Sequence, residues 1–382
     1  MKTKNVEEAK EYFAELVKEQ LNRIKSLKKE EWVNYKKLKP IKIGFLAGDG
    51  IGPYIMNEAK KILKFLLKEE EENGEIQFID INGLTIENRV KIMKAVPLDV
   101  LEEIKKCHAI LKGPTTTPKK GDQWPNIESA NVALRKELDL FANIRPVKIP
   151  KEGINWIFFR ENTEGAYALG NKGINITDNL SIDFTITTTQ GSERIIKLAF
   201  DYAKKNKIDK VTVVTKANVI KTTDGKFLSI AEDIAKKYSE IELDSWFVDI
   251  FSAKLLDPRR RKKFKVVVLP NLYGDIITDE AAELQGGVGT AGSANIGKEY
   301  AMFEAIHGSA LRMVEEGRAK YSNPLSILRA AVMLLQHIGF TEKADKLNKA
   351  LDICMNERKI VITGHSDGVT CSEFADYILE KI

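Results

Sequence analysis

Residues 44–53 read GFLAGDGIGP, an apolar strand that runs into alternating glycines. The dinucleotide-binding fingerprint is G-x-G-x-x-G after a strand, with an acidic residue at the end of the following strand. Gly48 and Gly50 fit its first two positions, but Pro53 stands where the third glycine belongs. Asp80 ends the next strand about ten residues later than the fingerprint requires. The stretch by itself therefore favours a tight strand-to-helix turn on permissive backbone, with a Rossmann phosphate loop as the alternative.

The bulk composition is that of an ordinary soluble globular protein, with 382 residues, 43% of them hydrophobic and 30% charged. Residues 1–40 hold 11 Lys/Arg against 7 Asp/Glu, so they carry most of the net charge of +5. The nearly neutral remainder argues against nucleic acid as a partner, and the basic run 259–263 is typical of a solvated turn. The sequence has no run of 18 apolar residues and its N-terminus lacks the apolar core of a signal peptide, so no membrane segment is expected. Three scattered cysteines indicate free thiols in a reducing, cytoplasmic compartment.

The pattern along the chain is that of an α/β protein. Apolar residues at three- and four-residue steps predict an amphipathic helix over 5–28. From residue 41 onward, strands and helices alternate, with one helix expected through 54–72, which predicts a largely parallel sheet. The polar, β-rich stretch between about 170 and 190 predicts an inserted hairpin or arm.

A set of short motifs in fixed order extends this reading beyond the glycine turn. Their ranges are GDGIGP at 48–53, GPTTTP at 113–118, SANVALRKELDLFANIRPV at 129–147, FRENTEGAY at 159–167, KANVIKTTDGKF at 216–227, LPNLYGDIITDEAA at 269–282, SANIG at 293–297 and FEAIHGSA at 303–310. Together they resemble the isocitrate/isopropylmalate dehydrogenase family over about residues 41–382. The resemblance implies a two-domain α/β fold distinct from the Rossmann fold, NAD or NADP, a divalent metal, and dimers or larger oligomers.

The resemblance also implies a division of the chain. We expect an N-terminal helical extension over 1–40. A large α/β domain on the cofactor side takes 41–140 and 286–382, and a small α/β domain takes 141–285. The arm at about 165–190 belongs to the small domain, where the family uses it for dimerisation.

The expected substrate is a small polycarboxylate, because Arg135, Arg145 and Arg160 stand in family motifs and arginine forks suit carboxylates. Ser129 and Asn131 precede Arg135 as in isocitrate enzymes, whereas isopropylmalate enzymes place apolar residues there. Polar donors reject an alkyl analogue that leaves them unpaired. The sequence thus favours oxidative decarboxylation of isocitrate, as in the tricarboxylic acid cycle; homoisocitrate and 3-isopropylmalate are the alternatives within the family.

Metal binding and proton transfer involve five further residues. Asp275 and Asp279 are four apart, so on a helix they face one way, and oxygen ligands suit Mg²⁺ or Mn²⁺. The resemblance adds Asp249 as the third acid, Lys216 as the base and Tyr167 as the acid. In the family, Asp249 and Lys216 come from the partner subunit, which implies a homodimer or higher oligomer with shared sites.

The cofactor site is expected mainly in the C-terminal part. The residues that match the family's adenosine loop and adenine contact are Glu304, His307, Gly308, Ser309, Ala310 and Asn323, and Thr116 and Asn218 match the nicotinamide end. Arg312 stands where an aspartate marks NAD enzymes, and an arginine can hold a 2′-phosphate, so NADP is favoured over NAD. Leu311 replaces the family's usual proline beside it.

A non-catalytic regulatory subunit is the alternative from a different functional class. Such subunits typically lose the catalytic tyrosine, the lysine or the metal acids. All five of these residues, Tyr167, Lys216, Asp249, Asp275 and Asp279, are present, which favours an enzyme.

Overall fold

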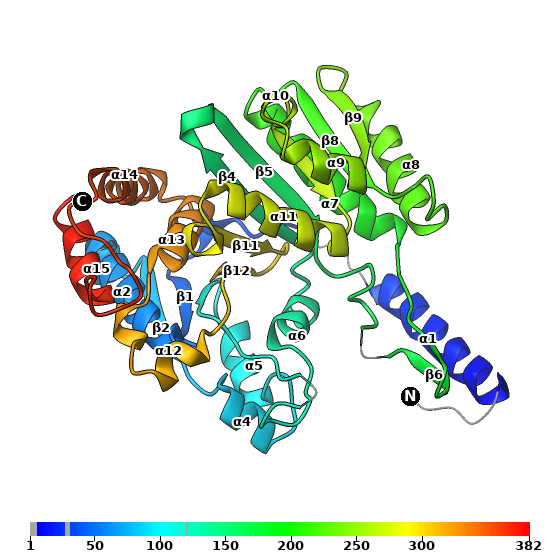
Figure 1. The fold of residues 1–382 in the computed structure, drawn as a ribbon, viewed down its shortest axis with the longest axis horizontal. Helices are drawn as coiled ribbons and strands as arrows, with labels where there is room; N and C mark the ends of the chain where they lie inside the picture. Colours follow the sequence, from blue (N-terminus) through cyan, green and yellow to red (C-terminus); the bar gives the residue numbers. More distant parts are fainter. Residues whose placement is uncertain (1–5, 27–30, 120, 171) are drawn as a thin grey trace. The chain divides into compact units, whose positions relative to one another are not determined.

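The computed structural model describes residues 6–26, 31–119, 121–170 and 172–382. The chain forms two compact units, the first from 1–31 and 148–281 and the second from 32–147 and 282–382. Each unit combines strands and helices, as Figure 1 shows. Within the described part of the chain, no helix is both long and apolar enough to cross a membrane.

The second unit is built on a mixed sheet in the order β2-β1-β3-β12-β11-β4. Its strands are β1 (Ile41–Leu46), β2 (Ile76–Ile81), β3 (Ala109–Lys112), β4 (Ala142–Ile149), β11 (Gly292–Ile296) and β12 (Ala301–Ala305). β1 is parallel to β2 and β3, and β12 is parallel to β3. β11 runs antiparallel to β12 and β4, so this sheet departs from an all-parallel nucleotide-binding sheet.

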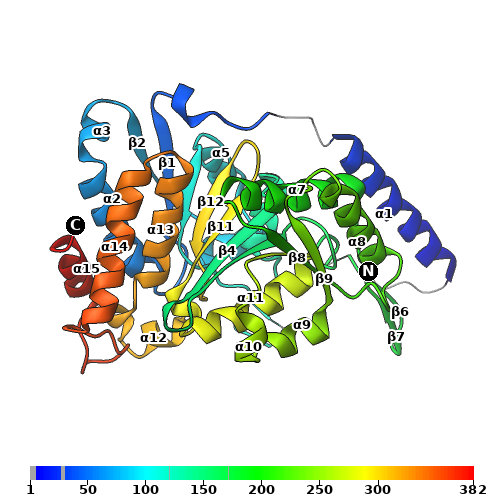
Figure 2. The ribbon, with the colours of Figure 1, turned by 90° about the horizontal axis from the view of Figure 1, so that it is seen from above.

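The helices of this unit pack on its sheet or on one another. They are α2 (Gly52–Leu66), α3 (Lys68–Glu72), α4 (Ile86–Lys91), α5 (Leu98–Lys105), α6 (Ala130–Glu137), α12 (Leu311–Glu315), α13 (Leu325–His337), α14 (Thr341–Glu357) and α15 (Cys371–Leu379). The expected helix through 54–72 is two helices, because Leu67 leaves helical geometry between α2 and α3. α13 is buried along most of its length and packs on β3, β11 and β12, with α2 and α14 beside it (Figure 2).

The first unit holds a parallel sheet in the order β5-β10-β8-β9. Its strands are β5 (Ile154–Glu161), β8 (Lys210–Thr215), β9 (Glu242–Phe247) and β10 (Val266–Leu269). Its helices are α7 (Thr189–Lys205), α8 (Thr223–Ala235), α9 (Val248–Leu255), α10 (Pro258–Arg261) and α11 (Asn271–Gln285), the last of which ends beyond the unit's boundary. The short β10 is fully buried, as expected for the centre of a parallel sheet.

Two additions to the α/β core were expected from the sequence, and both are present in the first unit. The amphipathic pattern over 5–28 forms α1 (Val6–Ser26). The polar stretch at 170–190 contains the antiparallel pair β6 (Ile174–Thr177) and β7 (Leu180–Ile182). α1 contacts β6, and Figure 1 shows the helix beside this hairpin.

The strand-to-helix turn at 48–53 is held by the protein's own backbone. Gly48 and Gly50 have φ of +72° and +60°, which favour glycine. A Cβ at Gly48 would collide with the carbonyl oxygen of Pro114, and one at Gly50 with that of Ser309. Pro53 lies in the first turn of α2, where its missing N–H costs no hydrogen bond. The turn is therefore a point of close packing between loops, in agreement with the sequence prediction.

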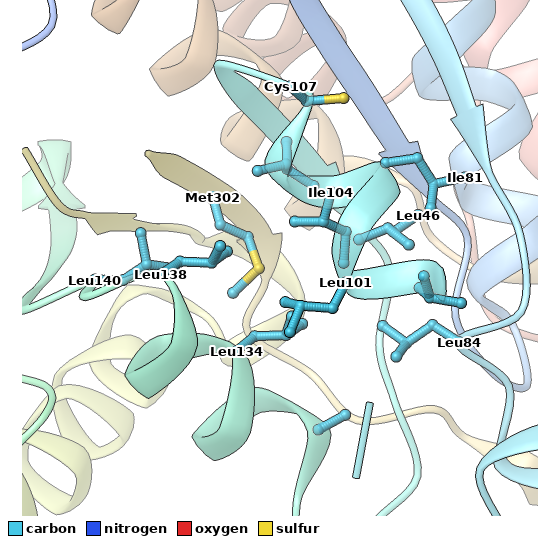
Figure 3. Packing of buried hydrophobic residues seen from close by; sticks show 13 residues of the cluster. Leu46, Ile81, Leu84, Leu101, Ile104, Cys107, Leu134, Leu138, Leu140 and Met302 are labelled. Atoms are coloured by element: carbon cyan, nitrogen blue, oxygen red, sulfur yellow. The ribbon is translucent and has the colours of Figure 1, made fainter. Parts of the chain in front are cut away.

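One apolar cluster joins the ends of β1 and β2 to α5 and α6 (Figure 3). Leu46, Ile104 and Leu134 are fully buried in it, and Met302 of β12 closes one side. Because α6 carries predicted substrate-binding residues, this cluster fixes the helix that presents them.

We expect Leu134→Ala to lower the free energy of unfolding by about 3 kcal/mol, because it leaves a cavity in this cluster. Leu98→Ala, at a leucine that is 72% exposed, serves as the control and should change stability by less than about 0.5 kcal/mol. Urea unfolding followed by circular dichroism measures both. Equal losses in the two variants would contradict the packing assigned to α6.

Candidate active site

The predicted site residues divide between the two units. The first unit holds Arg160, Tyr167, Lys216, Asn218, Asp249, Asp275 and Asp279. The second unit holds Thr116, Ser129, Asn131, Arg135, Arg145, Glu304, His307, Gly308, Ser309, Ala310, Arg312 and Asn323.

In the first unit, Arg160 and Tyr167 meet at Asp275. Arg160 is the next-to-last residue of β5 and is 1% exposed, and its Nη1 pairs with Asp275 Oδ1 on α11. The hydroxyl of Tyr167 donates to Asp275 Oδ2 at 2.9 Å. Arg160 Nε also donates to the backbone oxygen of Asn271 at 2.9 Å, and a Cβ at Gly274 would collide with the Arg160 stem. The glycine at 274 thus lets α11 pass close to the arginine and present Asp275 to it.

A second pair in the same unit joins Lys216 to Asp249. Lys216 follows β8, Asp249 lies in the first turn of α9, and Nζ to Oδ1 is 2.5 Å. The hydrogen bond from Lys216 is the largest cause that lowers the pKa of Asp249. The backbone N–H of Lys216 donates to Asp224 Oδ2 at 2.6 Å, which fixes the strand end. Asn218 lies in the turn that follows.

The acids suit a divalent ion in chemistry but are incomplete in one chain. Asp275 and Asp279 are one helical turn apart on α11, Asp275 is partly exposed and Asp279 is exposed. Their oxygens match the ligands that Mg²⁺ and Mn²⁺ prefer. Among the described residues, however, no group of three His, Cys, Asp or Glu side chains lies close enough to hold a metal. A single copy therefore does not bring Asp249 to the other two acids.

In the second unit, the buried carboxylate of Asp49 connects three loops. Its Oδ1 accepts from the N–H of Ile86 and its Oδ2 from the N–H of Thr116, each at 2.7 Å. The N–H of Asp49 itself donates to the oxygen of Pro114 at 2.8 Å. Burial raises the pKa of Asp49, while these two amides and Arg89 oppose the rise. The glycine turn is thereby tied to the loop that carries Thr116.

Arg89 completes this connection from α4. It is fully buried, and its Nη1 and Nη2 donate to the carbonyl oxygens of Thr116 at 2.8 Å and Glu128 at 3.1 Å. Ser129 follows Glu128 and takes the N-cap position of α6, without a side-chain cap bond to that helix. The guanidinium of Arg89 thus connects the loop that carries Thr116 to the start of α6, the helix predicted to bind substrate.

The hydroxyl groups of Thr115 and Thr116 contact two further candidate residues, Asn131 and Ser309. Thr116 Oγ1 and Ser309 Oγ are 2.8 Å apart. Thr115 Oγ1 donates to Asn131 Oδ1 at 3.1 Å. The structure therefore brings Thr116, predicted for the nicotinamide end, next to Ser309 of the predicted adenosine loop, and Asn131 next to Thr115.

Glu304 lies in a buried charge cluster. It is 5% exposed and pairs with Lys112 at 3.3 Å and with Arg135 at 3.2 Å. Asn295 donates to the same carboxylate at 2.7 Å. Burial alone would raise the pKa of Glu304, but Lys112, Arg135 and the hydrogen bonds lower it to about 2, whereas burial lowers the pKa of Lys112. The carboxylate predicted to bind cofactor thus also fixes Arg135 within the protein.

The remaining cofactor candidates follow β12. Burial lowers the pKa of His307, whose Nδ1 lies 3.0 Å from the oxygen of Gly308. Ala310 has φ of +47° at the start of the short helix α12. Arg312 is exposed on that helix and pairs with Glu316 at 2.6 Å. Asn323 Oδ1 accepts from the N–H of Leu325 at 2.9 Å and so helps to start α13.

Some residues that organise the site were not singled out from the sequence. Asp49, Arg89 and Lys112 hold the candidates of the second unit, and Asp49 and Lys112 stand within or beside quoted motifs. The available signal was a charged residue inside an apolar or glycine-rich stretch, which indicates a buried partner. Arg145 is 7% exposed on β4, so its predicted substrate contact requires a mostly buried side chain.

A family model described as isocitrate/isopropylmalate dehydrogenase matches residues 42–378. The chain belongs to this family. Family membership makes it an oxidoreductase of the dehydrogenase type that acts on small molecules. The helix α1 precedes the residues that the family model matches.

Individual relatives agree with membership of the isocitrate/isopropylmalate dehydrogenase family. A homoisocitrate dehydrogenase of Methanocaldococcus jannaschii is 37% identical, over 90% of this chain and 99% of its own length. An isocitrate dehydrogenase [NADP] of Rickettsia bellii is also 37% identical, over 90% of this chain and 70% of its own. The crystal structure of isocitrate dehydrogenase from Methylococcus capsulatus aligns with a TM-score of 0.78 at 34% identity, covering 89% of this chain and 98% of that one. The predicted family fold is thereby confirmed.

We expect Glu304→Gln to lower the free energy of unfolding by roughly 3 kcal/mol at about pH 7, because Lys112 and Arg135 lose a buried partner. The folded-state pKa of Glu304, about 2, lies below the unfolded value of about 4.3. The ionised form therefore stabilises the fold fully above the unfolded pKa, and this contribution is lost as the pH falls toward 2.

Urea unfolding of the wild type and the variant at about pH 7, 5, 4 and 3 measures this difference. Glu299→Gln, at an exposed glutamate between β11 and β12, is the control. A difference that stays constant from about pH 5 to pH 3 would show that Glu304 is not a stabilising anion.

Proposed function

We propose that the protein oxidises isocitrate to 2-oxoglutarate and CO₂, with reduction of NADP and with Mg²⁺ or Mn²⁺ bound. The observation that carries this proposal is the polar start of α6, where Ser129 and Asn131 precede Arg135. Family membership supports the reaction type, a dehydrogenation of a small hydroxy acid.

The substrate is argued from the surroundings of α6. Asn131 and Arg135 are four residues apart, so they face the same side of the helix, and both Ser129 and Asn131 are half-buried. Thr115 adds a further hydroxyl beside Asn131. An isopropyl group would leave these polar groups unpaired, whereas a distal carboxylate would accept from them. Homoisocitrate also presents a distal carboxylate, and the M. jannaschii relative named for it makes it the second candidate.

Proton transfer is assigned to residues of the two pairs in the first unit. Lys216, which lies beside Asp249, takes the proton of the substrate hydroxyl when it is in its neutral amine form, and Tyr167, beside Asp275, delivers a proton to the carbon after CO₂ leaves. Arg160 orients Asp275 and contributes positive charge for substrate carboxylates. Asp275 and Asp279, with Asp249 of another copy, would hold a divalent ion, which would supply Lewis-acid stabilisation of developing negative charge.

The proposal includes a homodimer or larger oligomer, because one copy does not gather three metal acids among the described residues. Asp249 and Lys216 of one copy then serve the metal and substrate of another. The division into a cofactor-side domain (41–140 and 286–382) and a small domain (141–285), and a cytoplasmic location, belong to the same proposal.

Steady-state kinetics with isocitrate, homoisocitrate and 3-isopropylmalate, each with NADP or NAD and Mg²⁺ or Mn²⁺, test the function. We expect the highest kcat/KM with isocitrate and NADP, and loss of activity after EDTA treatment that Mn²⁺ restores. A higher kcat/KM for homoisocitrate would replace the substrate, and one for isopropylmalate would refute the role of Ser129 and Asn131. No turnover with any combination would support a non-catalytic subunit.

Cofactor choice is assigned to Arg312. We expect Arg312→Gln to raise KM for NADP about tenfold and to leave KM for NAD within about twofold, since only NADP presents a 2′-phosphate to the guanidinium. Initial-rate kinetics with both cofactors measure the effect. Lys346→Gln, which removes a positive charge from the exposed face of α14, is the control. An equal change for NAD and NADP would contradict the assignment.

A further inference from the structure

The helix α1 is docked on the first unit, although it precedes the residues that the family model matches. Leu16 is 4% exposed, and the rings of Phe13 and Phe184 lie 5.5 Å apart. Glu19 accepts from Lys172 Nζ at 2.6 Å, and the helix contacts β6. These contacts hold the helix along its length beside the hairpin (Figure 1).

The last turns of α1 bring an arginine to a buried carboxylate. Arg23 Nη2 lies 2.9 Å from Oε1 of Glu164, whose residue is only 3% exposed. Arg23 Nε donates to Gln20 Oε1 at 2.9 Å, so the helix itself orients the guanidinium. The helix thus places a positive charge on the segment 160–167, which carries Arg160 and Tyr167.

Glu164 joins that segment to α7. Its carboxylate accepts from the N–H of Thr188 at 2.8 Å and from Thr188 Oγ1 at 2.5 Å, and Thr188 is the N-cap of α7. A Cβ at Gly191 would collide with the Glu164 carboxyl group, so the contact is closely packed. The carboxylate is therefore anchored at the N-terminus of a long helix, where negative charge is favourable.

The backbone of Glu164 joins the same segment to α11. Its carbonyl oxygen accepts from Asn271 Nδ2 at 3.0 Å. The Oδ1 of Asn271 accepts from Arg160 Nη2 at 2.6 Å, and Arg160 in turn pairs with Asp275. A displacement of Glu164 would consequently shift Asn271 and, through it, Arg160. It would also disturb Asp275, which contacts both Arg160 and Tyr167.

A second buried carboxylate makes the segment sensitive to the charges around it. Glu161 accepts from the N–H groups of Thr163 and Glu164 at 2.9 and 2.7 Å. Burial and the charge of Glu164 raise the pKa of Glu161, while Arg194 opposes the rise. Arg194 also donates to Thr163 Oγ1 at 2.8 Å. Two carboxylates this close raise the cost of ionisation, and a cation at Glu164 lowers it.

We propose that Arg23 is a positioning residue, through which the N-terminal helix fixes Glu164 and thereby the segment that carries Arg160 and Tyr167. The kinetic part of this inference rests on the proposed function, and the structural part does not. α1 then acts on the candidate site indirectly, through the contact of Arg23 with Glu164.

Hydrogen–deuterium exchange on the full chain tests the structural part without any substrate. We expect Arg23→Gln to increase the exchange rate of the backbone amides at 163–165 about tenfold, because the buried carboxylate of Glu164 loses its partly exposed cationic partner. Lys10→Gln, which removes an exposed charge from the same helix, is the matched control and should leave these amides unchanged. Arg23→Lys should restore most of the protection. Equal exchange in Arg23→Gln and Lys10→Gln would overturn the proposal.

Kinetics on the preferred substrate test the functional part. We expect Arg23→Gln to raise substrate KM and to lower kcat, each about fivefold to tenfold, with recovery in Arg23→Lys and no change in Lys10→Gln. A wild type inactive on all three substrates would refute the proposed function alone, because the exchange result would stand. Normal kinetics in Arg23→Gln despite faster exchange would overturn the positioning role.

A double variant covers the case in which Arg23→Gln folds poorly. If Arg23 acts through Glu164, Arg23→Gln/Glu164→Gln removes the charge together with its partner. We therefore expect its kcat and exchange to match those of Glu164→Gln alone within about twofold. An additional tenfold loss in the double variant would show that Arg23 acts by another route and would overturn the proposal.

Discussion

The buried carboxylate of Asp49 is the constraint on which the second unit's candidate residues depend. It accepts from the backbone N–H groups of Ile86, at the start of α4, and of Thr116, which lies 30 residues further along the chain. A buried carboxylate that lost these donors would cost several kilocalories per mole, so the loops and the acid specify one another. Arg89 extends the same arrangement to the start of α6 by donating to Thr116 and Glu128. Thr116 and Ser129, which lie outside the regular interior of helices and strands, are thus positioned by buried polar groups.

The first unit follows a similar rule with charged pairs in place of backbone donors. Asp275 receives both Arg160 and Tyr167, and Asp249 receives Lys216. Each pair joins a residue at or after the end of a parallel strand to one on a helix that follows, which is where active sites of α/β proteins commonly form. Two of the acids predicted to hold a metal, Asp249 and Asp275, thereby also contact the residues predicted to transfer protons.

Local patterns in the sequence predicted the helices, the strands and the family, because secondary structure and short motifs depend on residues that are close together in the chain. The spacing of Asp275 and Asp279 correctly indicated one helix face, and Pro53 correctly excluded a Rossmann turn. The single helix through 54–72 was wrong, since periodicity alone does not register the break at Leu67. Pairings such as Arg23 with Glu164 join residues 141 positions apart, and a single sequence carries no signal for which distant charge will be the partner. The substrate and cofactor contacts of the site residues stay predictions.

The glycine at position 50 has a consequence for how such sequences are interpreted. In dinucleotide folds the second glycine of the motif lets a phosphate oxygen of the ligand approach the backbone. Here the oxygen that approaches Gly50 is the carbonyl of Ser309, and the N–H of Ile51 donates to it at 3.0 Å. The protein occupies with its own main chain the space that the same pattern elsewhere reserves for a ligand. Alternating glycines after a strand therefore indicate that an oxygen atom approaches the backbone closely. Only the rest of the chain indicates whether that oxygen belongs to a ligand or to the protein itself.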